Sequence, residues 1–175
     1  VQEANYQKVK QENIRINKEK EETFRLYETM VQNHPAGLAI IGDNFTIEFV
    51  NQKLTELTKY SPEEMTGSDF RLYLSEKSRK NVSKAYQASR EGKDVPNIYE
   101  FDILRKDERS LPCEMYVSIL NIEGKTKSLA QILDISRIKE VEERWFYALK
   151  GSQAGVWDWN IKNDQVFFSK TWKAM

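Results

Sequence analysis

The hydrophobic pattern divides the chain into a charged leading segment and a more apolar remainder. Residues 1–30 are rich in Lys, Glu, Gln and Asn and contain no Gly or Pro, which favours one continuous helix. Weakly apolar residues recur every seven positions from Val9 to Met30, but intervening positions such as Asn13 and Lys20 are polar. This pattern predicts either a weak coiled coil or a solvated helix, and both interpretations stay open.

From residue 31 to about 137, short apolar runs alternate with turn and cap residues. Branched and aromatic runs predict strands, and a cap residue before a helix-forming segment predicts a helix. Two strands, several helices and then three strands in a meander imply an α+β domain, with one antiparallel sheet and helices on one face. The predicted strands are 37–41, 46–50, 97–105, 110–122 and 125–134, and the predicted helices are 52–58, a short one opening at 61–64, and 76–90.

A strand-like run changes to a helical pattern at the end of this domain. Ser136 can cap the outgoing helix, and Asp134 places a negative charge near its positive end. We expect this connector helix over residues 138–150. Ile138, Val141 and Trp145 are three and four residues apart on it, the spacing of a helix seam. The five residues therefore form a candidate junction between the domain and the helix that leaves it.

Composition narrows the classes of partner. Lys plus Arg (27) equals Asp plus Glu (27), so net charge favours neither nucleic acid nor an anionic membrane. No apolar run approaches the ~18 residues of a membrane span. The single cysteine, Cys113, excludes an internal disulfide and fits a reducing compartment, so we expect a cytoplasmic location. With one histidine and no phosphate-binding glycine loop, the sequence offers no catalytic set, and we expect this chain not to be an enzyme.

Five short motifs follow one another at characteristic spacings. They are Asn33-His34-Pro35-Ala36-Gly37, Phe49-Val50-Asn51, Tyr60-Ser61-Pro62-Glu63-Glu64-Met65-Thr66-Gly67, Arg105-Lys106-Asp107 and Asp134-Ile135-Ser136. Taken in this order, they resemble a PAS domain. The resemblance implies a five-stranded antiparallel sheet of order 2-1-5-4-3 with helices on one face, over residues 31–137. Glu108 departs from the family pattern, which usually has glycine in that turn.

Residues 151–175 resemble the opening hairpin of a second PAS domain. The similar segments are Gln153–Asn160 and Phe167–Trp172, which are rich in aromatic residues. We interpret the sequence as a piece of a longer signalling protein. An isolated hairpin is marginally stable and leaves such aromatic residues exposed, so we expect it to be disordered or docked on a partner.

The resemblance also bears on cofactors. Flavin-binding photosensors of this family use a cysteine where this chain has Phe70 and a glutamine where it has Ile132. Haem-binding relatives ligate iron with a histidine in the long helix, and the aligned position is Val82. The resemblance therefore argues against flavin and haem, and leaves an unidentified small molecule as the remaining ligand.

The inner face of the predicted sheet is the candidate pocket. Period-two alternation, together with the resemblance, directs a mostly apolar set of side chains toward the helices. We favour a core filled by these side chains over a ligand pocket, since Tyr99 is the one polar residue among them that could orient a ligand. The set is Ile47, Phe49, Tyr99, Phe101, Cys113, Met115, Val117, Ala130 and Ile132.

Two functions remain open. In the first, the domain senses a stimulus or small ligand and relays it through the five junction residues and its C-terminal helix to a downstream output module of a sensor histidine kinase. In the second, it is a ligand-free dimerisation and spacer module in a kinase or a cyclic-dinucleotide signalling enzyme. Both predict a homodimer formed through the leading and connector helices, with downstream PAS and output domains as partners.

Overall fold

The computed structural model describes residues 2–152 and 155–173, which fall into two units, residues 1–134 and 135–175. Gln153 and Ala154 of the predicted hairpin segment lie outside the described residues, as does the side chain of Val9. The helices are α1 (Gln2–Gln32), α2 (Gln52–Thr58), α3 (Pro62–Met65), α4 (Glu76–Arg90), α5 (Ser136–Ser152) and α6 (Lys170–Lys173), with 3₁₀ turns η1 (Asp43–Phe45) and η2 (Phe70–Tyr73). The strands are β1 (Gly37–Ile41), β2 (Ile47–Val50), β3 (Ile98–Leu104), β4 (Ser110–Ile122), β5 (Lys125–Asp134), β6 (Trp157–Asn160) and β7 (Gln165–Phe168).

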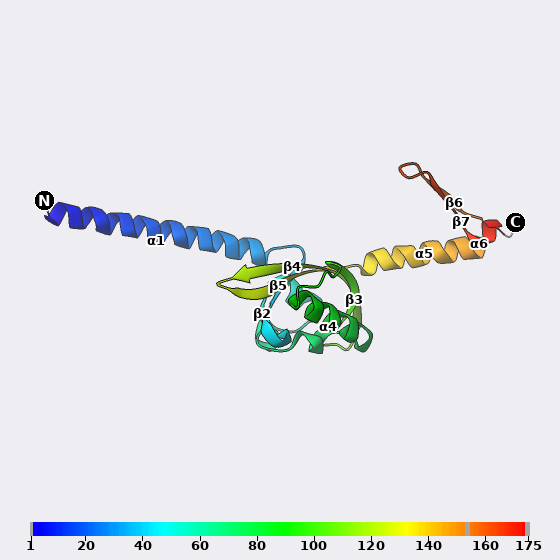
Figure 1. Cartoon of the computed structure of the whole chain (residues 1–175), viewed down its shortest axis with the longest axis horizontal. Coiled ribbons are helices and arrows are strands. Elements are labelled where there is room, and N and C mark those ends of the chain that lie inside the picture. The colour runs from blue at the N-terminus through cyan, green and yellow to red at the C-terminus, as the bar shows by residue number, and fades with distance from the viewer. Residues whose placement is uncertain (1, 153–154, 174–175) are drawn as a thin grey trace. The chain divides into compact units, whose positions relative to one another are not determined.

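The first unit contains a five-stranded antiparallel sheet of order β2-β1-β5-β4-β3, as predicted. The longest ladder joins β4 and β5, which pair from Cys113–Asp134 to Ile122–Lys125. Helices α2, α3 and α4 and turn η2 lie on one face of the sheet (Figure 1). This arrangement confirms the predicted α+β fold class.

A β-bulge in β2 changes which residues face the helices. Ile40 pairs with Phe49, but the next residue, Ile41, pairs with Ile47, so Glu48 is an extra residue in the ladder. Ile47 and Val50 are both buried, whereas Phe49 lies on the opposite face of the sheet. The expectation that Phe49 faces the helices is therefore wrong, because simple alternation does not include the bulge.

Side-chain caps define where the short helices begin. Asn51 is fully buried, and its Oδ1 accepts from the backbone N–H of Leu54, capping α2. Ser61 and Glu64 form a capping box at the start of α3, with Pro62 at the first helical position. Asparagine and serine are both among the residues preferred at helix N-caps.

The segment after α3 and the first turn of α4 are fastened to opposite edges of the sheet. The backbone N–H of Gly67 donates to the carbonyl of Ile47 at 2.7 Å, and the backbone N–H of Ile47 donates to the carbonyl of Ser68 at 2.9 Å. Gly67 has a positive φ of +82°. At the other edge, Ser78 Oγ accepts from the backbone N–H of Asp102 at 2.8 Å, which ties α4 to β3. These contacts hold the helices in place over the sheet.

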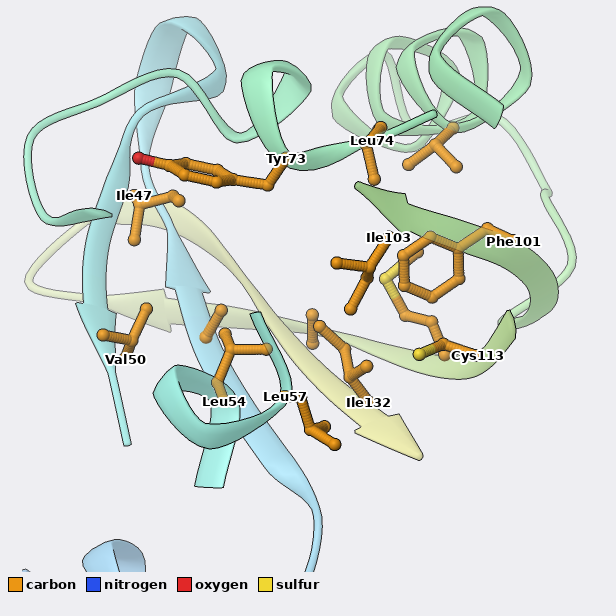
Figure 2. Close-up of a cluster of buried hydrophobic side chains, with 14 of the residues drawn as sticks. Ile47, Val50, Leu54, Leu57, Tyr73, Leu74, Phe101, Ile103, Cys113 and Ile132 are labelled. Atoms are coloured by element: carbon orange, nitrogen blue, oxygen red, sulfur yellow. The ribbon is translucent and has the colours of Figure 1, made fainter. Parts of the chain in front are cut away.

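Apolar side chains from both layers meet between the sheet and the helices. Figure 2 shows Ile47, Ile103 and Ile132 of the sheet extending toward the same interior space as Tyr73 and Leu74. Each of these five residues is less than a tenth exposed. Their burial away from water supplies the main driving force for folding the domain.

Helix α1 is a long charged helix with exposed apolar side chains. Ion pairs such as Arg15–Glu19 and Lys18–Glu22 follow its surface at one-turn spacing. Phe24, Tyr27 and Met30 are each 60% exposed or more in the single chain. Within residues 2–152 and 155–173, no helix combines the length and apolar character needed to cross a membrane.

The second unit contains α5 and a two-stranded hairpin. Helix α5 begins at Ser136, so Ser136 is its first residue and not, as predicted, the cap before it. Strands β6 and β7 pair in register from Trp157–Phe168 to Asn160–Gln165. The predicted hairpin thus forms, and its Trp157 is 60% exposed.

Candidate functional site

A cavity of about 450 Å³ lies between the sheet and the helices of the first unit. This volume falls in the range of small-molecule pockets, about 300–1,000 Å³. The interior is therefore not completely filled by side chains, contrary to the favoured expectation. The lining comes from every strand and helix of the layer: Ala39, Ile41, Ile47, Leu54, Thr58, Met65, Phe70, Tyr73, Leu74, Val82, Ala85, Tyr86, Ser89, Gly92–Asn97, Tyr99, Phe101, Ile103, Met115, Val117, Ile119, Ser128, Ala130 and Ile132.

Seven of the nine predicted pocket residues line this cavity. They are Ile47, Tyr99, Phe101, Met115, Val117, Ala130 and Ile132. Cys113 faces inward as expected but is fully buried within the core. Phe49 is on the opposite face because of the bulge at Glu48.

Most polar groups of the lining are hydrogen-bonded within the protein. Tyr86 donates its hydroxyl proton to the carbonyl of Gly42 at 2.5 Å, and Ser89 donates to the carbonyl of Tyr86 at 2.8 Å. Thr58 donates to the carbonyl of Leu54 at 2.9 Å. Ser128 differs: it is 3% exposed, and within the described part of the chain its Oγ has no hydrogen-bond partner.

Sequence reasoning missed Ser128, although the signal was available. Ser128 precedes Ala130 and Ile132 by two and four residues on β5, so alternation places all three on the same face. The structure confirms this facing, because Ser128 pairs with Ile41 on β1 and with Ile119 on β4. Tyr99 is therefore not the sole polar group that the sheet presents to the cavity.

The exposed lining residues, which mark the mouth of the cavity, include those of the loop that joins α4 to β3. Residues 92–97 of this loop are mostly exposed, and Ile119 on β4, which also lines the cavity, is 48% exposed. Arg90, in the last turn of α4, bonds to the carbonyl of Thr126 and to the carboxylate of Asp43. Arg90 thus joins the end of α4 to β5 and to the β1–β2 turn beside this mouth.

Aromatic side chains close the helical side of the cavity. The Phe45 ring lies 5.7 Å from Phe70 and 4.8 Å from Tyr86, measured between centroids. The Arg71 guanidinium lies 3.8 Å above the Phe45 ring, while its own carboxylate partner is Asp69. These contacts fix η2 against α4.

The positions that the resemblance assigns to cofactor chemistry carry apolar side chains. Phe70, Val82 and Ile132 all line the cavity. None has the thiol, imidazole or amide that the flavin and haem relatives use at those positions. Across the described residues, no group of three or more His, Cys, Asp or Glu side chains gathers to hold a metal ion.

Burial favours the neutral forms of two ionisable groups of the inner face, Cys113 and Tyr99. Burial raises the pKa of the Cys113 thiol to about 12, and the charges of Asp134 and Asp102 act in the same direction. Burial likewise raises the pKa of the Tyr99 phenol. The inner face therefore presents uncharged groups at neutral pH.

The predicted relay residues lie on β5 and α5. Asp134 is the last residue of β5, where it pairs with Cys113, and Ser136 begins α5. Along α5, Ile138 is 57%, Val141 45% and Trp145 65% exposed. Their side chains are thus exposed in the single chain.

Comparison with known proteins identifies the family. A family model described as the PAS domain matches residues 35–137, more than half of the chain. The solved PAS domain of an HTR-like protein from Haloarcula marismortui is 25% identical, with a TM-score of 0.60 over 69% of this chain and 98% of that chain.

Two more distant structures share the fold. A PAS domain from a two-component sensor histidine kinase is 16% identical to this chain, with a TM-score of 0.55. A PAS domain from a Colwellia psychrerythraea protein is 14% identical, with a TM-score of 0.56. Each of the two matches covers 66% of this chain and 98% of the matched chain. The comparison with curated proteins found no match. By its family match, its sheet order and its helical layer, the chain belongs to the PAS domain family.

Proposed function

We propose that this PAS domain senses a small molecule in its internal cavity and relays the signal through α5 to a downstream output module. The observation that carries the proposal is the cavity of about 450 Å³, whose walls are mainly apolar and whose mouth lies at the α4–β3 loop. Apolar walls with a few polar groups are typical of sites that enclose small ligands. A fully packed domain would have offered no such space.

A relay requires that ligand binding changes something outside the cavity. Met115 and Ile132 line the cavity and are paired with each other, and β5 ends at Asp134. A ligand that shifts β4 and β5 can therefore change the end of β5, directly before α5. We propose that two arrangements of the helical ends in a dimer carry the signal, with Ser136, Ile138, Val141 and Trp145 on the outgoing helix.

The proposed output module is that of a sensor histidine kinase. The family resemblance supports this, and the solved PAS domain of a two-component sensor histidine kinase has the same fold. A cyclic-dinucleotide enzyme is the second candidate for the output module. In either case, a second PAS domain that begins at the β6–β7 hairpin would lie in the sequence between this domain and the output module. We place the segment in the cytoplasm, where its free cysteine would stay reduced.

Ligand release and thermal shift test the sensor proposal. The purified full chain is denatured, and released small molecules are identified by mass spectrometry. In parallel, a metabolite library is screened for compounds that raise the melting temperature with dose. We expect at least one compound to do so, and expect Ala130→Phe, which fills the cavity, to abolish its effect.

Gln131→Phe is the matched control, because Gln131 is the next residue on β5 and is exposed on the opposite face. This variant should respond to the compound as the wild type does. If nothing is released and no compound gives a shift that Ala130→Phe abolishes, the sensor proposal fails and the spacer function remains.

A further inference from the structure

Ser128 is a buried hydroxyl that faces the cavity without a partner. It is 3% exposed, and among the described residues its Oγ meets no hydrogen-bond donor or acceptor. Buried polar side chains are normally hydrogen-bonded, because burial removes their contacts with water. A serine hydroxyl can donate one hydrogen bond and accept two. A partner for Ser128 Oγ would therefore come from a molecule inside the cavity, water or ligand.

The other polar side chains of the lining either form hydrogen bonds within the domain or are accessible to water. Thr58, Tyr86 and Ser89 each donate to a backbone carbonyl within the domain. Tyr99 is only partly buried and Asn97 is exposed, so water can reach both. Ser128 is thus the hydroxyl for which a ligand group is the natural partner.

The charge of the lining restricts the ligand further. Lys93 and Asp94 are the only lining residues that carry a charge at neutral pH, and both are exposed on the α4–β3 loop. Lys93 is already paired with Glu91, at 2.5 Å. An ionised ligand inside the cavity would lose its water without gaining a counter-charge, which is strongly unfavourable.

The position of Ser128 gives the ligand an orientation. Ser128 pairs with Ile119, which is 48% exposed at the mouth, whereas Met115 and Ile132 lie four residues farther along β4 and β5. A polar group at Ser128 is therefore close to the mouth. The apolar remainder of a ligand would extend toward Met115, Ile132 and Phe101.

We propose that the cavity binds an uncharged, mainly apolar molecule with one hydroxyl or carbonyl group that hydrogen-bonds to Ser128 Oγ. This inference rests on the proposed sensor function and specifies its class of ligand. Ser128 is a specificity residue in this scheme: it selects for a polar group at the mouth end of an otherwise apolar molecule.

Three naphthalene probes with one differing group test the proposal. Binding of 2-naphthol, 2-methylnaphthalene and 2-naphthoate to the full chain is measured by calorimetry at pH 7. The decisive quantity is the ratio of the 2-methylnaphthalene and 2-naphthol dissociation constants, compared between wild type and Ser128→Ala. This comparison cancels the different costs of removing the two probes from water. We expect Ser128→Ala to shift the ratio against 2-naphthol by about threefold to tenfold, the effect of one neutral hydrogen bond.

Ser89→Ala is the matched control, because it removes a lining hydroxyl that already has a protein partner, and it should leave the ratio unchanged. An unchanged ratio in Ser128→Ala, or an equal shift in both variants, overturns the Ser128 contact while the cavity itself still binds. Binding of 2-naphthoate as tight as that of 2-naphthol overturns the restriction to uncharged ligands. If no probe binds the wild type, the inference of a mainly apolar ligand is overturned, whereas the sensor proposal is still decided by the release and thermal-shift experiments.

Discussion

The side-chain amide of Asn51 donates a hydrogen bond to the carbonyl of Val31, with 3.1 Å between Nδ2 and the oxygen, and so connects the start of α2 to the last turn of α1. The same amide donates to the carbonyl of Ala36 at 3.0 Å, and the Oδ1 atom of Asn51 accepts from the backbone N–H groups of Leu38 and Leu54. One fully buried side chain thus holds together α1, β1 and α2.

Replacing Asn51 should therefore destabilise the domain strongly. Asn51→Ala leaves four backbone groups without this partner, three of them in buried hydrogen bonds, and we expect a loss of about 3 kcal/mol or more in the free energy of unfolding. Urea unfolding followed by circular dichroism measures it. Ser61→Ala, which removes an exposed cap, should cost only about 1 kcal/mol. Equal losses in the two variants would contradict this role.

Glu108 occupies a backbone conformation that suits glycine. Its φ is +61°, in the turn between β3 and β4 where the family pattern usually has glycine. Glu108→Gly should raise the free energy of unfolding by about 0.5–1 kcal/mol, because glycine adopts this conformation without steric cost. Glu108→Ala is the control: it removes the carboxylate but keeps the strain, so it should not stabilise. A gain in the alanine variant would point to charge and not to backbone conformation.

Asp69 should make part of the domain's stability acid-sensitive. The Arg71 guanidinium holds the pKa of the Asp69 carboxyl below its ordinary value of 3.8, through hydrogen bonds of 3.0 and 2.5 Å. Because the folded-state pKa is lowered, the stabilisation is complete above the unfolded-state pKa and is lost as pH falls through the folded-state value. The stability difference between wild type and Asp69→Asn should therefore shrink from pH 6 to pH 3 in urea titrations. A difference that does not change with pH would exclude this ion pair as its source.

Cys113 should be unreactive in the folded protein. Its thiol is fully buried, and its pKa is raised to about 12 from an ordinary value of 9.0. Since the folded-state pKa is the higher one, the contribution to stability is intact below pH 9 and declines as pH rises toward 12. At pH 8, Ellman's reagent should modify native Cys113 far more slowly than the urea-unfolded chain, because only the exposed thiolate reacts. Comparable rates in both states would contradict the burial.

Helix α5 is the proposed contact between two copies. Trp145→Asp should weaken the dimer, as sedimentation velocity would show, because it places a charge on the seam with Ile138 and Val141. Tyr147→Asp is the matched control: Tyr147 is 67% exposed but lies on the opposite side of the helix. A dimer that persists in Trp145→Asp, or that both substitutions weaken equally, would contradict a seam at these residues.

Local signals made much of the fold predictable. Asn51 and Ser61 are strong cap residues, and the strands of the meander show the alternation that a sheet with two different faces requires. The bulge at Glu48 has no such local signal, and it placed Phe49 on the other face from the one predicted. Alternation is therefore informative only as far as the ladder is regular.

The cavity could not be predicted in the same way. Whether side chains such as Phe101 and Met115 fill the interior depends on how far the helices stand from the sheet. That distance is set by contacts remote in sequence, such as those of Ser78 with Asp102 and of Gly67 with Ile47. Ser128, in contrast, was predictable from alternation, but its unpaired hydroxyl becomes apparent only when its surroundings are known.

If the proposed ligand binds in the cavity beneath the α4–β3 loop, it also affects the lifetime of the protein. A void of about 450 Å³ withholds packing contacts that a filled core would have, so a molecule that binds only the folded state adds its binding free energy to stability. Chains with an occupied cavity would then unfold less often and be degraded more slowly by proteases. Resistance to thermolysin, with and without a bound probe, would measure this effect, through which a ligand could set the number of receptors as well as their signalling state.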